Sequence, residues 1–508
     1  MTTSTSNAQA GARTRADLVA QPAGAPLAGA RAPAAEVPRT LWSRFIILML
    51  CLAVVTTTLA FGTVHAWSLA AFQLSAGVVF ALWMVDAWRT GVLRVSRNLL
   101  QLPLLGLLAV GLVQLLPLGG SGETLTAAPH STRMVLAQLA GLAVYFAAAL
   151  AFIDSPRRLK MMTRVVIIFG FLLAVYGLMQ HFVNPQTIFW VREPKQAQPF
   201  GPYVNRHHFA GYMELTLAMP LGLLFAGAVG RERVPLYAFA SLIMAVALVM
   251  TNSRGGMLSM VCEIIFLTLV AAGLGRRGRG EEEGEGRGGR ARAALLRVGL
   301  GFLLIVAVVF GALYFGGEGA LSRLVGTVNS EDPTTGRAHF WRGTLGIIRD
   351  HPLLGTGLGS FPAAYPLYDT ASGSYRLEQA HNDYLQILSD AGVVGGLLGL
   401  VFLLVLFGAA LRRMQSPDRF RRGVALGALA GCAGALVHSF FDFTLHTTAN
   451  ALMFLLLAAL ATADGRVEDP DAMPQRRRRR RRRHAGQDES DAEAGRQSAA
   501  PEKEGAAA

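Results

Sequence analysis

AGVVGGLLGLVFLLVLFGAAL, residues 391–411, decides the fold class, because it is a run of 21 residues without a charge. A helix rises 1.5 Å per residue, so about 20 apolar residues cross the hydrocarbon core of a bilayer. Similar runs recur along the 508 residues, which are 52% hydrophobic and 16% charged, whereas soluble domains carry about 25% charged residues. The sequence therefore predicts an all-α integral membrane protein. It excludes a soluble enzyme, a secreted disulfide scaffold and a nucleic-acid-binding module.

Twelve apolar stretches of near-spanning length follow from this pattern. They are residues 45–63, 67–85, 99–118, 134–153, 165–183, 209–229, 234–251, 255–274, 298–315, 391–411, 423–441 and 447–463. We therefore predict about 12 transmembrane helices. All three cysteines, Cys51, Cys262 and Cys432, fall inside these stretches, which favours small core residues over disulfides or a metal site.

Lysine and arginine in the connecting loops predict the orientation, because these residues hold loops in the cytoplasm. The loops after even-numbered stretches carry 21 of them in 62 residues, and the loops after odd-numbered stretches carry 10 in 126. Both termini are therefore predicted to be cytoplasmic. The loop 316–390 is predicted to lie on the opposite, periplasmic face.

Composition divides the chain into three parts. Residues 1–43 are predicted to be a disordered cytoplasmic tail, residues 44–463 a polytopic membrane domain and residues 464–508 a disordered polybasic cytoplasmic tail. Eight consecutive arginines, Arg476 to Arg483, lie in the second tail, and without them the net charge of +14 falls to +6. We expect the arginine run to be a solvated tail close to anionic membrane lipids, and a lipid or partner switch is the alternative. No nucleic acid is expected as a partner.

The loop 316–390 is far longer than a connection needs, and long loops tend to carry function. Residues 337–350 are predicted to be helical, with Pro352 just past the end. The residues expected on its apolar face are Trp341, Leu345 and Ile348. A second helix is predicted to start near Glu378. Its stripe would carry His381, Leu385 and Leu388.

The predicted orientation brings polar residues from separate regions to one membrane face. They are Asn205, Arg206, His207 and His208 before the sixth stretch, Asn252, Ser253 and Arg254 after the seventh, and Arg337, Arg342, His381, Asn382 and Asp383 in the long loop. Arg254 is the most informative, because a cation at the interface must find an anion or extend into water. Clustered arginines suit a phosphate or diphosphate, since the guanidinium donates bidentately and stays charged.

Histidine and buried glutamate add other chemistry. The reference pKa of histidine is near 6.5, so His381 can act as general base towards a sugar hydroxyl, and a structural role is the alternative. Glu263 and Glu214 lie within stretches, where they are expected either to relay protons or bind substrate, or to face other helices as neutral groups. The polar residues near stretch ends that are expected to bond locally are His181, His438 and Asp442. The sequence carries no metal or nucleotide motif, so we expect no metal and no cofactor.

Five segments on this face form a recognisable set. They are GPYVNRHHFAGY (201–212), TNSRGG (251–256), GRAHFW (336–341), HPLLGTGLGSF (351–361) and AHNDYLQILSDAG (380–392). In order and sidedness these segments resemble the O-antigen ligase and polymerase superfamily. The resemblance covers residues 199–396, the core of the predicted membrane domain.

The resemblance implies a metal-independent inverting glycosyltransferase in the bacterial inner (cytoplasmic) membrane, with its active site on the periplasmic face. Its donor would be a glycan on undecaprenyl diphosphate, and its acceptor a hydroxyl of a glycan or of lipid A core. By motif, Arg254 and Arg337 correspond to diphosphate-binding arginines, and His381 to the histidine that activates the acceptor. The secondary candidates are Arg206, His207, Arg342, Asn382 and Glu263.

Several functions remain open. An O-antigen ligase acting on lipid A core ranks first, an O-antigen or exopolysaccharide polymerase second, and a protein glycosyltransferase lower. A transporter or flippase is the alternative from a different class. Such proteins usually place their binding groups near the midplane of the membrane, and here Glu263 is the one residue that favours transport. A purely structural membrane scaffold would leave the long loop and its clustered cations unexplained.

Overall fold

The computed structural model describes residues 40–118, 122–195, 197–277, 337–370 and 376–464, and the single positions 299, 306 and 467. Every regular element within these residues is a helix, and two isolated β-bridges accompany them. The elements are α1 (Leu41–Leu59), η1 (Phe61–Thr63), α2 (Ala66–Thr90), α3 (Gln101–Gln114), α4 (Pro129–Phe152), α5 (Pro156–Val183), α6 (Arg206–Phe225), η2 (Arg231–Arg233), α7 (Val234–Met250), α8 (Arg254–Arg277), α11 (Arg337–Asp350), α12 (Phe361–Ala364), η4 (Tyr365–Leu367), α13 (Asp383–Arg413), α14 (Arg419–His438), η5 (Thr444–His446) and α15 (Thr448–Thr462). The predicted all-α class is confirmed for this part of the chain.

Eleven of the predicted apolar stretches coincide with a described helix, and the ninth, 298–315, lies outside the described residues except for the single positions 299 and 306. Among the described helices, eight are long and apolar enough to cross a membrane, and α3 and α15 are shorter. This supports an integral membrane protein but leaves the number of about 12 spans a prediction. Nearly all of the two predicted tails, 1–43 and 464–508, also lies outside the described residues.

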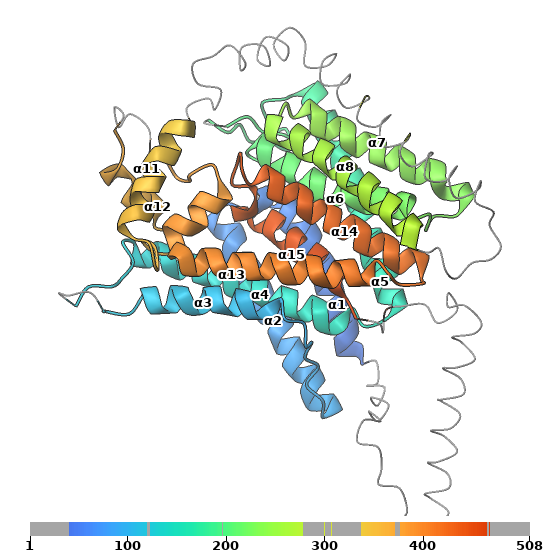
Figure 1. Cartoon of the computed structure of the whole chain (residues 1–508), viewed down its shortest axis with the longest axis horizontal. Helices are drawn as coiled ribbons and strands as arrows, with labels where there is room; N and C mark the ends of the chain where they lie inside the picture. Colours follow the sequence, from blue (N-terminus) through green and yellow to red (C-terminus); the bar gives the residue numbers. More distant parts are fainter. Residues whose placement is uncertain are drawn as a thin grey trace, which may run out of the picture. The chain divides into compact units, whose positions relative to one another are not determined.

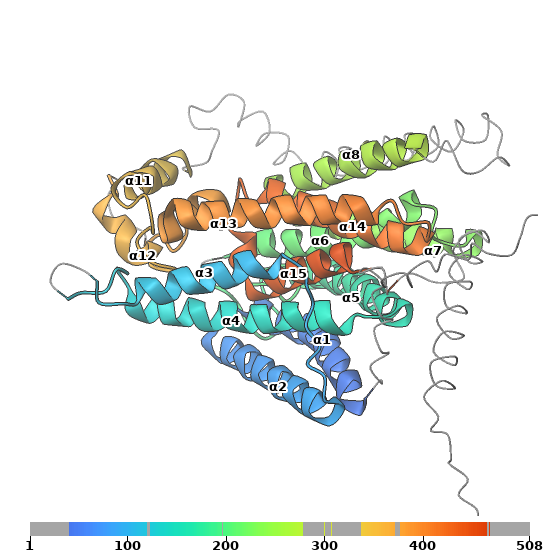
Figure 2. The ribbon, with the colours of Figure 1, turned by 60° about the horizontal axis from the view of Figure 1, so that its bottom comes forward.

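Helix α6 forms the centre of the bundle. It packs against α5, α7, α8, α14 and α15, and nearly all of its side chains are buried. Figure 2 shows α6 and α15 between α1, α2 and α4 on one side and α8, α13 and α14 on the other. A Cβ added to Gly222 of α6 would lie 2.3 Å from the Cα of Gly427 in α14, so the two backbones touch. Helices in lipid associate through such close packing of small residues, because lipid tails supply no hydrophobic drive between them.

The outer helices turn apolar side chains away from the bundle. The residues that are at least 45% exposed include Leu397, Leu400, Val401 and Leu404 on α13, and Leu74, Val78 and Phe80 on α2. A water-soluble surface rarely carries such continuous apolar area, whereas a lipid-facing surface requires it. The exposed faces of α2 and α13 therefore agree with a membrane environment.

Helix α11 occupies 337–350, as predicted, but its buried face differs from the predicted one. Its buried residues are Gly343, Thr344 and Ile347, while Leu345 is 53% exposed. The predicted face of Trp341, Leu345 and Ile348 is therefore wrong. The reason is local packing, because a Cβ added to Gly343 would lie 2.7 Å from the ring of Tyr365. The absence of a side chain at Gly343 lets η4 pack there, and this contact sets the orientation of the helix.

Helix α13 combines two predicted elements in one. It begins at Asp383, not near Glu378, and continues through the predicted tenth stretch with a kink at Gly392 (φ 64°, ψ −163°). A Cβ at Gly392 would lie 2.2 Å from the carbonyl oxygen of Leu353, so only glycine fits this bend. Figure 1 shows α11 and α12 beyond the first turn of α13, at the same end of the helices. The described part of the long loop, 337–370 and 376–390, is thereby packed onto the end of the bundle at which α13 begins.

Candidate functional site

Asp442, in the loop between α14 and η5, joins two of the predicted site residues. Its Oδ1 lies 3.3 Å from Nδ1 of His381, and its Oδ2 lies 3.6 Å from Nη2 of Arg337. The Asp442 side chain is 2% exposed, whereas His381 and Arg337 are 28% and 25% exposed. The expectation that Asp442 bonds locally holds for one contact, since its Oδ1 accepts the amide of Phe443 at 2.9 Å. It did not include the contact with His381, which is 61 residues away. A buried anion thus lies behind a histidine and an arginine that both reach the surface.

The ionisation of Asp442 defines the role of its histidine partner. Burial alone would raise the pKa of Asp442, but the hydrogen bond from His381 and the nearby His207 and His208 outweigh burial and hold the pKa below its usual range. An ionised carboxylate only accepts hydrogen bonds, so Nδ1 of His381 must be the donor. This assigns the tautomer that leaves Nε2 of His381 free to accept a proton.

The backbone of His381 is held in an uncommon conformation. Its φ of +50° lies in the left-handed region, which non-glycine residues rarely adopt. Asn382 follows as the N-cap of α13, and its Oδ1 accepts hydrogen bonds from the amides of Tyr384 (3.0 Å) and Leu385 (3.1 Å). Its Nδ2 donates to the carbonyl oxygen of Phe440 at 3.2 Å. Asn382 therefore explains why the helix starts later than predicted, and it fixes the residue directly after His381.

Asp383 ties the same turn to the loop between α14 and α15. Its amide donates to the carbonyl oxygen of Ser439 at 2.9 Å, and the Ser439 hydroxyl donates to Oδ2 at 2.7 Å. Nδ1 of His446 lies 2.7 Å from Oδ1 of Asp383. Burial alone would lower the pKa of His446, but the hydrogen bond and the charge of Asp383 reverse the effect and raise it. Two carboxylate–histidine contacts thus connect the start of α13 to one loop.

Aromatic rings surround the imidazole of His381. The Phe443 ring lies edge-on with a centroid distance of 4.9 Å, and Phe340 of α11 is stacked at 6.1 Å. These rings limit the orientations of the imidazole and lower its contact with water. The imidazole of His381 is therefore positioned by Asp442 on one side and by aromatic packing on the other.

A second part of the predicted site lies at the turn between α7 and α8. Nδ1 of His207 lies 2.9 Å from Oγ of Ser253, and the same oxygen accepts the amide of Gly256 at 3.2 Å. Asn252 in this turn has a φ of +52°. Arg254 follows as the first residue of α8 and is exposed. A guanidinium beside a helix N-terminus suits an anion, because both carry positive charge.

The other candidates take different places. Arg206 is the first residue of α6, next to His207, and Arg342 is exposed on α11. The structure therefore brings Arg337 and His381 together through Asp442, and places His207 against the turn that precedes Arg254. No described group of three or more histidine, cysteine, aspartate or glutamate side chains is arranged to hold a metal ion.

Glu263 belongs to a separate polar cluster inside the helices. Oε1 of Glu214 lies 2.7 Å from Nδ1 of His438, and Oε2 accepts the Ser259 hydroxyl at 2.8 Å. Both oxygens of Glu263 are buried without a hydrogen-bond partner among the described side chains, and one faces the small Gly434. The expectation that His438 bonds locally is therefore wrong. Glu214 and His438 instead connect α6 to α14.

Sequence reasoning missed Asp442, although one signal for it was present. The segment HSFFDF, residues 438–443, places an acidic residue directly after the eleventh stretch, where the charge count predicts the same membrane face as the long loop. An acidic residue at the end of an apolar stretch has many structural explanations. Only the tertiary contacts with His381 and Arg337 distinguish Asp442 from an acidic residue with a purely structural role.

Comparison with known families supports the resemblance. Residues 239–400 match the family model described as O-antigen ligase. This segment contains Arg254, Arg337 and His381, whereas Asp442 lies beyond its end. The resemblance predicted from the motifs is thereby confirmed for this segment.

A curated protein shows a related similarity. The exopolysaccharide production protein ExoQ of Rhizobium meliloti (strain 1021) is 27% identical over 168 residues. The alignment covers 30% of this chain and 37% of ExoQ, so the chain spans little more than a third of the length of that relative.

Proposed function

We propose that the protein is a membrane glycosyltransferase that moves a glycan from undecaprenyl diphosphate to an acceptor hydroxyl. The observation that carries this proposal is the position of Asp442 between His381 and Arg337. A histidine base with an anionic partner, beside a cation, provides for both proton removal and leaving-group stabilisation. The match to the O-antigen ligase model over Arg254, Arg337 and His381 supports it.

In the proposed reaction, the acceptor oxygen attacks the anomeric carbon of the donor, and the bond from this carbon to the diphosphate oxygen breaks with inversion. The proton of the acceptor passes to Nε2 of His381, and Asp442 stabilises the resulting imidazolium through Nδ1–H. Arg254 and Arg337 neutralise the charge that develops on the diphosphate. The guanidinium of Arg337 has five N–H donors, and its contact with Asp442 occupies only part of them.

The remaining candidates have supporting roles in this proposal. Asn382 holds the turn that carries His381, and His207 supports the α7–α8 turn before Arg254. Arg206 and Arg342 add positive charge for a diphosphate at this end of the helices. Since arginines supply the neutralising charge, we expect no metal requirement, and activity should persist in a chelator such as EDTA.

Two acceptors distinguish two versions of the function. Transfer to lipid A core at the periplasmic face of the inner membrane would make the protein an O-antigen ligase, which the description of the matching family model favours. Transfer to another lipid-linked glycan would make it a polymerase, which the similarity to an exopolysaccharide production protein favours. We place the ligase first and the polymerase second.

The test is the length distribution of surface and lipid-linked glycan in a strain that lacks the gene. Long chains that accumulate on the lipid carrier and are missing from lipid A core would identify a ligase. Single repeat units in place of long chains would identify a polymerase. Complementation with Arg254→Ala should fail to restore the normal pattern, although the protein is inserted. Full restoration by this variant would contradict the diphosphate contact.

A further inference from the structure

Backbone strain marks a second surface in the structure. Six non-glycine residues of the described chain have a positive φ, and they fall in two places. Asn252 and His381 belong to the candidate site. The other four are Phe61, Thr63, Phe189 and Trp190, with φ between 52° and 60°. A bulky residue in this conformation is strained, and strain persists where surrounding contacts enforce it, often at binding sites.

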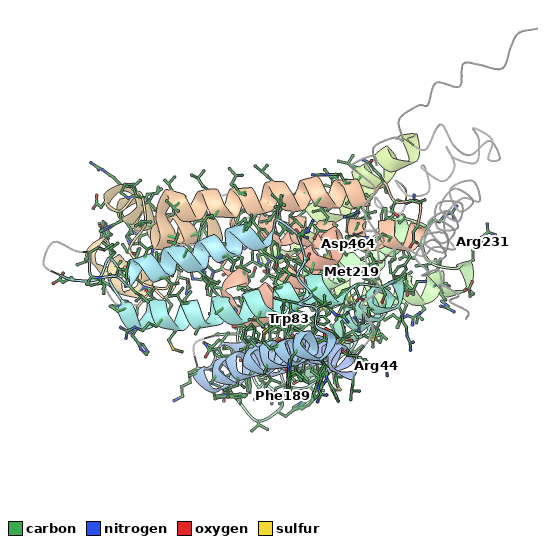
Figure 3. The ribbon with its side chains drawn as sticks, turned by 90° about the horizontal axis from the view of Figure 1, so that it is seen from below. Arg44, Trp83, Phe189, Met219, Arg231 and Asp464 are labelled. Carbon is green, nitrogen blue, oxygen red and sulfur yellow. The ribbon has the colours of Figure 1, made fainter. Side chains whose placement is uncertain are left out.

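The strained aromatic residues come from two loops that meet. Phe61 follows α1, and Phe189 follows α5, yet their ring centroids lie 5.7 Å apart in an edge-to-face arrangement. Tyr176 stacks on Phe189 at 5.5 Å and meets Trp190 edge-on at 5.8 Å, and Trp67 meets Phe61 edge-on at 6.3 Å. We call these five residues the aromatic platform. Figure 3 shows Phe189 beside α1 and α2.

A tight hairpin presents two of these rings. The Ile188 amide donates to the Arg192 carbonyl oxygen at 2.7 Å, and the Arg192 amide donates back at 3.0 Å. Phe189 and Trp190 lie in the turn, at positions where glycine or asparagine is usual. Trp190 is 44% exposed, and Trp67 is 59% exposed. The turn therefore holds two aromatic residues at the surface in a left-handed backbone conformation that aromatic residues rarely adopt.

Two polar groups complete the platform. The Arg192 guanidinium lies 5.0 Å from the centroid of Phe61, and its Nη1 donates to Nε2 of His65 at 2.7 Å. Burial, together with the charge of Arg192, lowers the pKa of His65. His65 is therefore neutral at physiological pH and keeps an N–H on its other ring nitrogen. The surface combines aromatic faces with fixed hydrogen-bond donors.

We propose that the aromatic platform is a glycan-binding subsite of the transferase. The negative face of an aromatic ring suits the C–H groups on the apolar face of a pyranose, and Arg192 and His65 suit its hydroxyls. A sugar surface has this alternation of C–H and O–H groups, whereas a lipid surface requires neither stacked rings in strained turns nor a paired arginine. The subsite rests on the proposed transferase function, because it would hold the sugar chain on which the candidate site acts.

Contacts connect the platform to the candidate site. Phe61 of the platform and Thr63 both belong to η1. The Thr448 hydroxyl donates to the carbonyl oxygen of Thr63 at 3.1 Å. The neighbouring Thr447 hydroxyl lies 3.0 Å from Nδ1 of His208. The ring of His208 meets that of Phe443 at 4.9 Å, and Phe443 meets His381 at the same distance. The platform therefore lies at the same end of the helices as the proposed base, a few side chains away.

The experiment compares Trp190→Ala with Trp190→Phe and Trp88→Ala in the full-length purified protein. Trp88 is a matched control, because it is 81% exposed, has Arg89 5.7 Å from its ring and lies in α2 outside the platform. The probe is the oligosaccharide released from the host's own lipid-linked glycan, titrated by calorimetry. Trp190→Ala should weaken its binding at least tenfold, Trp190→Phe should restore most of it, and Trp88→Ala should leave it unchanged.

Kinetics separate binding from catalysis. Trp190→Ala should raise KM for the acceptor or donor glycan at least tenfold, with kcat within about twofold of wild type. Equal binding by Trp190→Ala and wild type, or a loss confined to the amount of protein in the membrane, would overturn the subsite and identify an interfacial anchor. If wild type bound the oligosaccharide but transferred nothing from the lipid-linked donor, the proposed reaction would fail while the glycan subsite stood.

Discussion

Two carboxylate–histidine pairs in this protein have the same chemistry and opposite surroundings. Asp442 and His381 lie 3.3 Å apart in loops, and the histidine is 28% exposed. Glu214 and His438 lie 2.7 Å apart between α6 and α14, with exposures of 0% and 1%. The shorter contact is inaccessible, and the longer one reaches the surface beside Arg337. Access, and not the strength of the pair, is what qualifies a histidine as a base for a bound substrate.

The surroundings of each pair agree with this distinction. The interior pair is completed by the Ser259 hydroxyl, which belongs to a third helix, so it joins three elements that must pack together. The loop pair is flanked by aromatic rings and a cation, which position a base but leave one nitrogen free. The comparison predicts that changes at the loop pair affect turnover, and that changes at the interior pair affect stability.

The largest effect is expected for His381→Ala. A positioned general base contributes about 10²–10⁴-fold, so turnover should fall by about this factor. The measurement is transfer of a lipid-linked glycan by purified protein. His339→Ala is the matched control, because His339 also contacts a carboxylate, with Nε2 2.8 Å from Oδ1 of Asp369, but lies outside the Asp442 cluster. Full activity of His381→Ala across neutral pH would remove it as the base.

Asp442→Asn should have the next largest effect. Carboxylates that orient metal-bound histidines typically contribute about 10–100-fold, and by analogy we expect a loss of this order in kcat. The pKa of Asp442 is held below its usual range, so the carboxylate is ionised throughout the neutral range and its own protonation does not limit activity there. The amide carries no charge to stabilise the imidazolium that forms when the acceptor is deprotonated. Wild-type kcat in this variant would contradict the positioning role of Asp442.

The interior pair is tested by His438→Ala. Removing one partner of a buried pair leaves the other uncompensated and typically costs about 3–5 kcal/mol. We expect a clear fall in Tm and in the yield of folded protein, measured in detergent. His381→Ala should lower Tm less, because Arg337 still lies 3.6 Å from the Asp442 carboxylate. If both variants were equally stable, the distinction between the two pairs would not hold.

The smallest effect is expected for Glu263→Gln. Its carboxyl group is buried and has no hydrogen-bond partner among the described residues, and glutamine preserves the volume. A glycosyltransferase should therefore keep near wild-type turnover in the transfer assay. A transporter or flippase would depend on this intramembrane carboxyl group, so loss of activity in Glu263→Gln with retention in His381→Ala would favour transport.

Much of the fold could be predicted, because its signals are local. Helical spans follow from runs of apolar residues, and the bounds of α11 follow from its periodicity and the following proline. The start of α13 was misplaced because the capping hydrogen bonds of Asn382 depend on a backbone turn at His381. The buried face of α11 was misjudged because Gly343 admits Tyr365, which periodicity does not reveal.

The candidate site divides in the same way. Arg254, Arg337 and His381 carry motif signals within one half of the chain, and the matching family model covers all three. Asp442 and the aromatic platform lack motif signals, because their residues are scattered over loops and helices that are distant in sequence. In the sequence, Phe61 and Phe189 are indistinguishable from other apolar residues, and only the contact between their loops in the structure shows that they belong together.

The sequence by itself determined that the chain is helical and apolar enough for a membrane, and which cations gather in its long loop. Hydrophobic length and charge are properties of contiguous segments, so they can be read without a structure. The tertiary structure alone decided which carboxylate meets which histidine, and which pair is buried. Pairing and burial depend on how α6, α13 and α14 pack, and a difference in exposure between otherwise similar side chains separates a structural contact from a reactive one.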